Sequence, residues 1–162
     1  MNEFVTKAVV LDVFDQGEAD LCVILYTQER GKIVAKAKSA RKINSRLVAH
    51  LQPLTLTKVR LVNKKGYQVV DALQERKTLR VGEETKYLSL GKLIEALTNE
   101  EDPDPDLWNL LESGEIASQK VLTVLGFDVQ HATCGHCQSQ KPKHFLIKEM
   151  YYVCEGCFKN NA

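Results

Sequence analysis

The chain has 162 residues, of which 44% are hydrophobic and 27% are charged, and its formal net charge is +1. These values are typical of a soluble globular protein with one ordinary domain or two small ones. The N-terminus lacks the regions of a signal peptide, and no apolar run approaches the length of a membrane span. We therefore expect a cytoplasmic protein.

The net charge is near zero, but charge is distributed unevenly between the two halves of the chain. Residues 1–80 contain fifteen Lys and Arg against eight Asp and Glu, whereas residues 81–162 contain seven against thirteen. Such an asymmetry indicates that the first half meets a polyanion and the second half does not. The polyanion is either a nucleic acid or an acidic protein, and charge alone does not choose between them.

The first eighty residues have the pattern of a β domain. Five short runs are rich in Val, Ile, Leu, Thr and Tyr: Lys7–Val13, Leu21–Thr27, Lys32–Lys38, Leu54–Val62 and Gly66–Leu73. Turn residues separate the runs, and Asn63–Gly66 is a hairpin signal. Five short strands without a long helix before the fourth favour a small closed barrel of the OB type, although an SH3-like barrel would give a similar pattern.

The most basic stretch of this β domain is Gly31–Arg46, which has no acidic residue. If its first part is a strand, Lys32, Lys36 and Lys38 lie on one face and small apolar residues lie on the other. A basic loop with Arg41, Lys42 and Arg46 follows. The stretch is suited to a phosphate backbone, but an edge strand that uses lysines against aggregation would have the same pattern.

The pattern changes to helical after residue 80. Apolar residues at helical spacing predict a helix from Glu83 to Thr98. The acidic, proline-containing segment Asn99–Asp106 is expected to be an exposed linker. Two short helices, Leu107–Glu112 and Glu115–Leu125, should follow, and Gly126 should end the second. We therefore divide the chain into a barrel (1–80), a helical region (81–130) and a C-terminal module (131–162).

The C-terminal module contains two Cys-x-x-Cys pairs separated by sixteen residues. This is the spacing of a four-cysteine zinc site, with Cys134, Cys137, Cys154 and Cys157 as ligands. Four thiolates close the coordination shell, so one structural Zn²⁺ is expected. Disulfides would require an oxidising compartment, which the missing signal peptide does not favour. Cys22, in an apolar strand, is expected to be a core residue, while three nearby histidines could substitute as ligands: His131, His136 and His144.

No catalytic constellation is evident in the sequence. A zinc deaminase would need a His-x-Glu motif and a proline before a cysteine pair, and neither is present. The chain also lacks a phosphate-binding Gly-rich loop and a Gly-x-Ser-x-Gly motif. We therefore expect a protein that is not an enzyme.

Several short motifs follow one another in a defined order. They are Gly17–Asp20, Leu25–Thr27, Glu29 with Gly31-Lys32, Ala37–Lys42, Ser45-Arg46, Leu51–Leu54, Leu125–Phe127 and the second Cys-x-x-Cys. The resemblance that they carry extends over nearly the whole chain, from Lys7 to Cys157. No single motif is specific, but their order and spacing together resemble the RecO family of bacterial DNA repair proteins. The helical middle is shorter than is usual in the family, and Ser39 stands where glycine is more common.

The resemblance implies an OB-fold DNA-binding domain and a non-enzymatic recombination mediator. Such a protein binds single- and double-stranded DNA, anneals complementary strands and acts with RecR. It loads recombinase onto strands coated with single-strand-binding protein, which is a further candidate partner. The DNA-binding residues would be the basic set Lys32, Lys36, Lys38, Arg41, Lys42 and Arg46. These side chains suit contacts to phosphates rather than to bases.

Base stacking is expected to contribute little, because the aromatic residues of the barrel are few. They are Phe4, Phe14, Tyr26 and Tyr67, each expected in the core rather than on a binding surface. The alternative function, from a different class, is a zinc-ribbon adaptor whose basic strand contacts RNA or an acidic protein.

Overall fold

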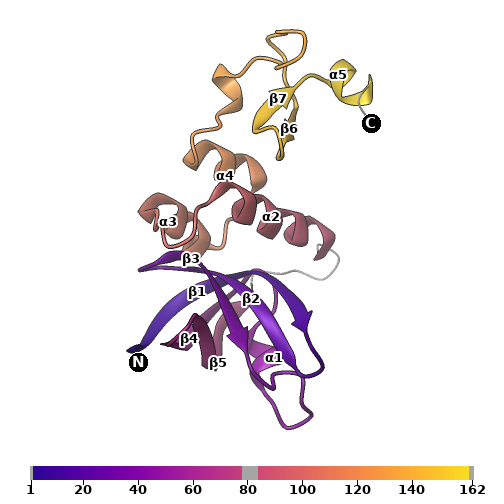
Figure 1. The fold of residues 1–162 in the computed structure, drawn as a ribbon. Helices are drawn as coiled ribbons and strands as arrows, with labels where there is room; N and C mark the ends of the chain where they lie inside the picture. Colours follow the sequence, from indigo (N-terminus) through magenta and orange to yellow (C-terminus); the bar gives the residue numbers. More distant parts are fainter. Residues whose placement is uncertain (1, 78–83, 161–162) are drawn as a thin grey trace. The chain divides into compact units, whose positions relative to one another are not determined.

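The computed structural model describes residues 2–77 and 84–160, and the chain divides into two compact units, 1–115 and 116–162. The described part of the first unit contains a β-barrel with three helices (Figure 1), and the second unit contains the cysteine pairs. The division differs from the three segments expected from the sequence, whose boundaries at residues 80 and 130 stay a prediction. Within the described ranges, no helix is long and apolar enough to span a membrane.

Five strands form the barrel: β1 (Asn2–Gln16), β2 (Asp20–Thr27), β3 (Gly31–Ala37), β4 (Thr55–Asn63) and β5 (Tyr67–Lys77). They close in the order β1-β2-β3-β5-β4, and β4 pairs with β1. Every pairing is antiparallel except that of β3 with β5. The predicted fold class of an OB-type barrel, short helices and a four-cysteine module is thus confirmed.

Alternating side chains build the interior of the barrel, as period-two strands require. In β3, Ile33, Ala35 and Ala37 are buried in the core, whereas Lys32 and Lys36, on the opposite face, are partly exposed. The small alanines suit the interior of a narrow barrel. A short helix, α1 (Leu47–His50), lies between β3 and β4.

Two helices cover part of the outer surface of the barrel: α2 (Glu84–Leu97) and α3 (Pro105–Ser113). Helix α2 lies on β1 so closely that a Cβ on Gly91 would clash with the carbonyl oxygen of Leu11. Outward-facing apolar residues of the strands, among them Val9 and Tyr26, are consequently buried. The predicted helix from Glu83 to Thr98 matches α2, although Glu83 lies outside the described residues.

The acidic segment between α2 and α3 is not a free linker. Its side chains are mostly exposed, as expected, but the backbone N–H of Glu101 donates to the carbonyl oxygen of Lys32 at 2.9 Å. Asp104 caps α3 through its carboxylate, and Pro105 occupies the first turn of that helix. Pro105 is tolerated because a proline at a helix start loses no hydrogen bond. The segment is therefore held against the start of β3.

The second unit comprises α4 (Ser118–Val124), the 3₁₀ turn η1 (Val129–His131), the hairpin β6 (His144–Leu146) and β7 (Tyr151–Val153), and α5 (Glu155–Asn160). Gly126 has a φ of 89° just after α4, which confirms it as the end of that helix. Phe127, Phe145 and Tyr152 pack edge to face, and the Tyr152 hydroxyl donates to the carbonyl oxygen of Phe127. These rings join the segment after α4 to the hairpin.

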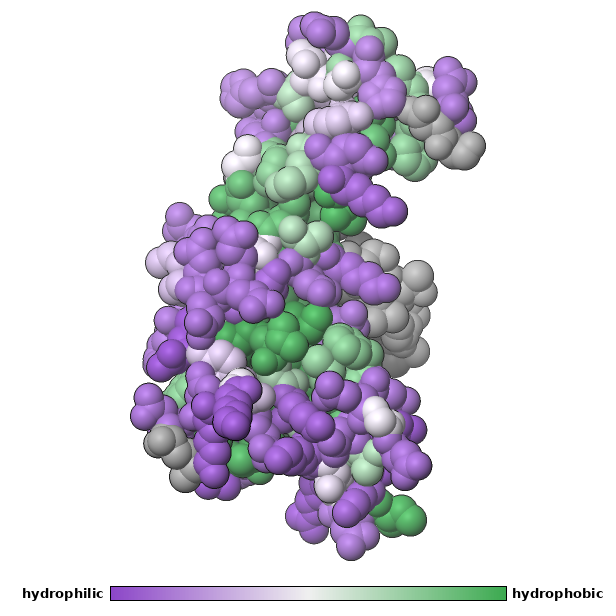
Figure 2. Space-filling model, in the orientation of Figure 1, coloured by the Kyte–Doolittle hydropathy of each residue, from purple (hydrophilic) through white to green (hydrophobic). Residues whose placement is uncertain are grey.

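Hydrophilic residues predominate on the face of the molecule shown in Figure 2, and hydrophobic residues reach the surface only in smaller patches. Large apolar side chains that are at least two-fifths exposed in the first unit include Val5, Phe14, Val34, Ile43 and Leu73. Single exposed apolar residues are normal, so only their position relative to other features is informative.

Candidate nucleic-acid interface and metal centre

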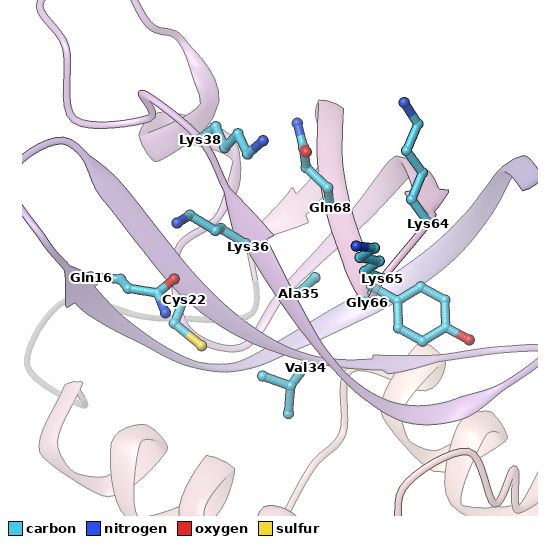
Figure 3. Close-up of a pocket in the computed structure, with 11 residues that line it drawn as sticks. Gln16, Cys22, Val34, Ala35, Lys36, Lys38, Lys64, Lys65, Gly66 and Gln68 are labelled. Carbon is cyan, nitrogen blue, oxygen red and sulfur yellow. The ribbon is translucent and has the colours of Figure 1, made fainter. Parts of the chain in front are cut away.

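A lysine-lined cavity of about 480 Å³ opens on the barrel beside β3 (Figure 3). Lys36 of β3 and Lys38 just after it contribute one side, and Lys64 and Lys65 of the β4–β5 turn contribute the other. Gln68 of β5 lies between the two pairs, because it is the register partner of Lys36. A smaller adjoining cavity is again lined by Lys38 and Lys64. The parallel pairing of β3 with β5 therefore gathers four ammonium groups.

Lys64 and Lys65 were not among the residues predicted from the sequence. Their segment was interpreted only as a hairpin turn, and the turn was confirmed. In OB barrels, however, the β4–β5 loop and the β1–β2 loop border the ligand-binding face. Two adjacent lysines in that loop were thus a usable signal, once the barrel topology had been assigned.

Five of the six predicted basic residues fall into three groups. Lys36 and Lys38 line the cavity. Arg41 pairs with Asp15 at 3.2 Å and donates to the carbonyl oxygen of Gly17, beside the β1–β2 turn. Lys42 and Arg46 are exposed on the loop before α1 and do not line the described cavities.

Lys32 has a different position from the one expected. Its ammonium donates to the carbonyl oxygen of Glu95 at 2.7 Å and to that of Thr98, at the C-terminal end of α2. A cation there satisfies carbonyls that have no partner inside the helix and complements the helix dipole. The outward direction of Lys32 was predicted correctly, but α2 covers that part of the face.

We predict that Lys32→Met lowers the stability of the protein without weakening nucleic-acid binding. The substitution removes charge-assisted hydrogen bonds to two carbonyls, so the free energy of unfolding should fall by about 1.5–3 kcal/mol. Denaturant unfolding and oligonucleotide titration would measure both effects. Lys58→Met, at an exposed position of β4, is the matched control. If Lys32→Met lost affinity for the oligonucleotide at unchanged stability, Lys32 would be a nucleic-acid-binding residue after all.

Asp20 is the acidic residue that opposes the lysines of the cavity. Its carboxylate pairs with Lys36 at 2.8 Å and accepts the backbone N–H of Ser39 at 2.7 Å. The Lys36 ammonium, together with the Ser39 N–H, lowers the pKa of Asp20 below its usual value. Ser39 has a φ of 54°, the left-handed conformation that glycine adopts most easily. Asp20 thus fixes the start of the basic loop and forms an ion pair with Lys36.

We predict that Asp20→Asn strengthens the binding of a polyanion. The substitution removes a competing charge but keeps an oxygen that can accept the Ser39 N–H. Because exposed ion pairs are weak, affinity at low salt should rise modestly, by up to about five-fold. Asp71→Asn, on the exposed surface of β5, changes the net charge equally and is the control. Equal effects of the two substitutions would contradict the role of Asp20.

The two cysteine pairs meet in the second unit. The sulfur atoms of Cys134, Cys137, Cys154 and Cys157 all lie within 4.8 Å of one another. The Cys137 and Cys154 sulfurs are 3.7 Å apart, and the edge of a tetrahedron with Zn–S bonds of about 2.3 Å is about 3.8 Å. The four donors therefore fit a tetrahedral metal ion. This arrangement is the one that the spacing predicted.

The backbone holds the cysteines in place. The N–H of Gly135 donates to the carbonyl oxygen of Tyr152, which ties the first pair to β7. A Cβ on Gly135 would be 2.5 Å from the Tyr151 ring, so a larger residue here would have to displace that ring. The N–H of Phe158 donates to the carbonyl oxygen of Cys154 and turns the second pair into α5. Sulfur positions are consequently set by the fold of the backbone around them.

The thiols influence one another strongly at these distances. Backbone N–H groups, that of Cys137 first, lower the pKa of Cys134 to about 6. Hydrogen bonding to neighbouring thiols, that of Cys154 first, raises the pKa of Cys157 to about 12. One thiolate thus forms readily, but four adjacent thiolates require a cation to offset their repulsion.

Two of the three nearby histidines have other partners. The Nε2 atom of His144 lies 2.8 Å from a carboxylate oxygen of Glu155, and its ring stacks on Phe158. The Nε2 atom of His136 lies 2.9 Å from the Tyr151 hydroxyl. Among the described residues, the metal-ligating cluster contains cysteines alone.

The fold and the site together define a class of protein, an OB-type barrel with a basic cavity joined to a four-cysteine module. Residues 1–78 match the family model described as "Recombination protein O N terminal". The DNA repair protein RecO of Bacillus pumilus is 28% identical over 176 residues, which cover 96% of this chain and 69% of the relative. The RecO protein of Bacillus subtilis is 29% identical with the same coverage. That of Salinibacter ruber is 37% identical over 65% of this chain and 44% of the relative.

The barrel is thus a RecO N-terminal domain, and nearly the whole chain is similar to RecO proteins. The match to the family model covers the whole of the barrel, and the relatives extend the similarity into the cysteine module. The names of the family and its members describe DNA repair and recombination, and none of them is that of an enzyme. This agrees with the prediction of a non-enzymatic protein.

Proposed function

We propose that this chain is a recombination mediator that binds DNA through the lysine-lined cavity of its barrel. The observation that carries the proposal is the convergence of Lys36, Lys38, Lys64 and Lys65 on the face where OB barrels bind oligonucleotides. Ammonium groups neutralise phosphates without reading bases, which suits a protein that must act at any sequence. Arg41 extends the basic surface toward the β1–β2 turn.

The more specific roles are inferred from the similarity to RecO proteins. We propose that the protein binds single- and double-stranded DNA, anneals complementary strands, and acts with RecR to load recombinase onto strands coated with single-strand-binding protein. Its place of action would be the bacterial cytoplasm, at the nucleoid. Co-purification with RecR and with single-strand-binding protein tests these partners directly, and failure to recover RecR would contradict the mediator role.

We also propose that the four cysteines hold one structural Zn²⁺. The sulfur positions match tetrahedral coordination, and thiolate ligands favour zinc among the metals commonly found in proteins. Four protein ligands leave no open coordination position, so the ion would stabilise the second unit rather than activate water.

A titration across a salt series tests the DNA-binding proposal. Single-stranded DNA, duplex DNA, RNA and an acidic peptide of equal length would be compared. If about four or five phosphates are neutralised, the logarithm of the affinity for single strands should fall with that of salt at a slope of roughly −3. Binding of RNA alone, or of the peptide alone, would favour the zinc-ribbon adaptor instead.

A further inference from the structure

An exposed aromatic side chain lies on the same surface as the lysines. Phe14 is 48% exposed, although it belongs to a strand with a buried apolar centre. It was expected in the core, and the other three aromatic residues of the barrel fit that expectation better. Tyr26 is buried, and Phe4 and Tyr67 are partly buried and pack edge to face.

A β-bulge turns Phe14 outward. Val10 pairs with Leu25 and Asp12 pairs with Ile24, so Leu11 is an extra residue in β1. Before the bulge, Val10 is in the barrel core, and after it Val13 packs against that core. Phe14 therefore has the opposite direction from Val13 and faces outward.

The register of the sheet places Phe14 in a row with the cavity. Phe14 pairs with Cys22, Cys22 pairs with Lys36, and Lys36 pairs with Gln68. Cys22, Lys36 and Gln68 line the cavity. Two strand spacings, about 10 Å, separate Phe14 from Lys36. A single strand crossing this row would meet an aromatic face next to the ammonium groups.

We propose that Phe14 is a stacking platform for a base of single-stranded nucleic acid. The ring offers a π face to any base, and Lys36 and Lys38 attract the adjoining phosphates. The bases of an intact duplex have both faces occupied by their neighbours, so the contact selects single strands. This inference rests on the proposed function, because it takes DNA as the occupant on grounds of charge complementarity.

Substitutions at Phe14 test the proposal in the full chain. Phe14→Ala should weaken binding of oligo(dT) about ten-fold or more and leave duplex binding within about two-fold. Phe14→Leu keeps apolar bulk but removes the π face, and it should lose nearly as much affinity. Val5→Ala is the matched control, since Val5 is an equally exposed residue of β1 at 49%.

A fluorescence measurement separates stacking from a structural effect. Trp108 is the single tryptophan and is only 3% exposed, so Phe14→Trp adds an exposed reporter. Oligo(dT) should quench it, whereas an abasic oligomer of equal length and charge should bind without quenching. Two results would overturn the inference while the proposed function stands. One is that Phe14→Trp binds oligo(dT) without quenching, and the other is that Phe14→Ala and Phe14→Leu bind oligo(dT) with unchanged affinity. If the wild-type chain binds no DNA, the proposed function itself fails.

Discussion

Removal of the proposed Zn²⁺ is expected to unfold the second unit and leave the barrel folded. Structural Zn²⁺ in small modules contributes about 10–16 kcal/mol of apparent binding free energy, far more than a short hairpin and two short helices supply. Strands β6 and β7 have three residues each, and helices α4 and α5 have seven and six. Hydrogen exchange after chelation should show lost protection in residues 116–160 and retained protection in the strands of the barrel.

Cysteine substitutions make the metal prediction specific. Cys137→Ser combined with Cys157→Ser should abolish binding of one metal ion per chain and produce the same exchange pattern as chelation. Cys22→Ala is the control, because Cys22 is in the barrel and outside the cluster. A metal-free protein with four free thiols and an intact second unit would contradict the prediction.

Replacing Lys36, Lys38, Lys64 and Lys65 together with Ala is expected to abolish measurable DNA binding at moderate salt. Each lost phosphate contact reduces the salt slope for single strands by about 0.7, so little electrostatic attraction would remain. The fold should persist, because all four side chains are at least partly exposed. Circular dichroism and thermal unfolding would verify the fold, and fluorescence anisotropy would measure binding.

A charge control accompanies this quadruple variant. Lys58→Ala combined with Lys92→Ala removes two exposed lysines of the same unit that do not line the cavities. It should reduce affinity only slightly, through the general field of the protein. Wild-type affinity in the quadruple variant, or an equal loss per lysine in the control, would show that the cavity has no special role.

The sequence predicted the barrel and the cysteine cluster well, for identifiable reasons. Strand alternation is a local property, so the apolar face of β3 was readable from Ile33, Ala35 and Ala37 alone. The spacing of the cysteine pairs also predicted their meeting, since two turns joined by a hairpin bring them together. Both patterns depend on neighbours within a few tens of residues.

The differences between the prediction and the structure arise from long-range packing and from a register shift in β1. The two carbonyls at the end of α2 that accept from Lys32 belong to residues 63 and 66 positions away, and no local sequence pattern predicts this contact. The pairing of β3 with β5 brings Lys36 toward Lys64 and Lys65. The bulge at Leu11 reverses the direction of Phe14, which strict alternation would place with Val10. These features are determined by tertiary structure.

The docking of the acidic segment on β3 has a consequence for the path of a bound strand. Glu101 is tied to Lys32 through its backbone, and its carboxylate accepts from the Tyr67 hydroxyl at the border of the cavity. The exposed carboxylates of the acidic segment thus lie beside the beginning of β3, where the Lys32 ammonium is held by carbonyls at the end of α2. The cavity lysines lie at the other end of the strand, where Asp20 pairs with Lys36. A polyanion is repelled at one end of the strand and attracted at the other. We therefore expect a short footprint with a fixed boundary, so that longer oligonucleotides gain little affinity from each barrel.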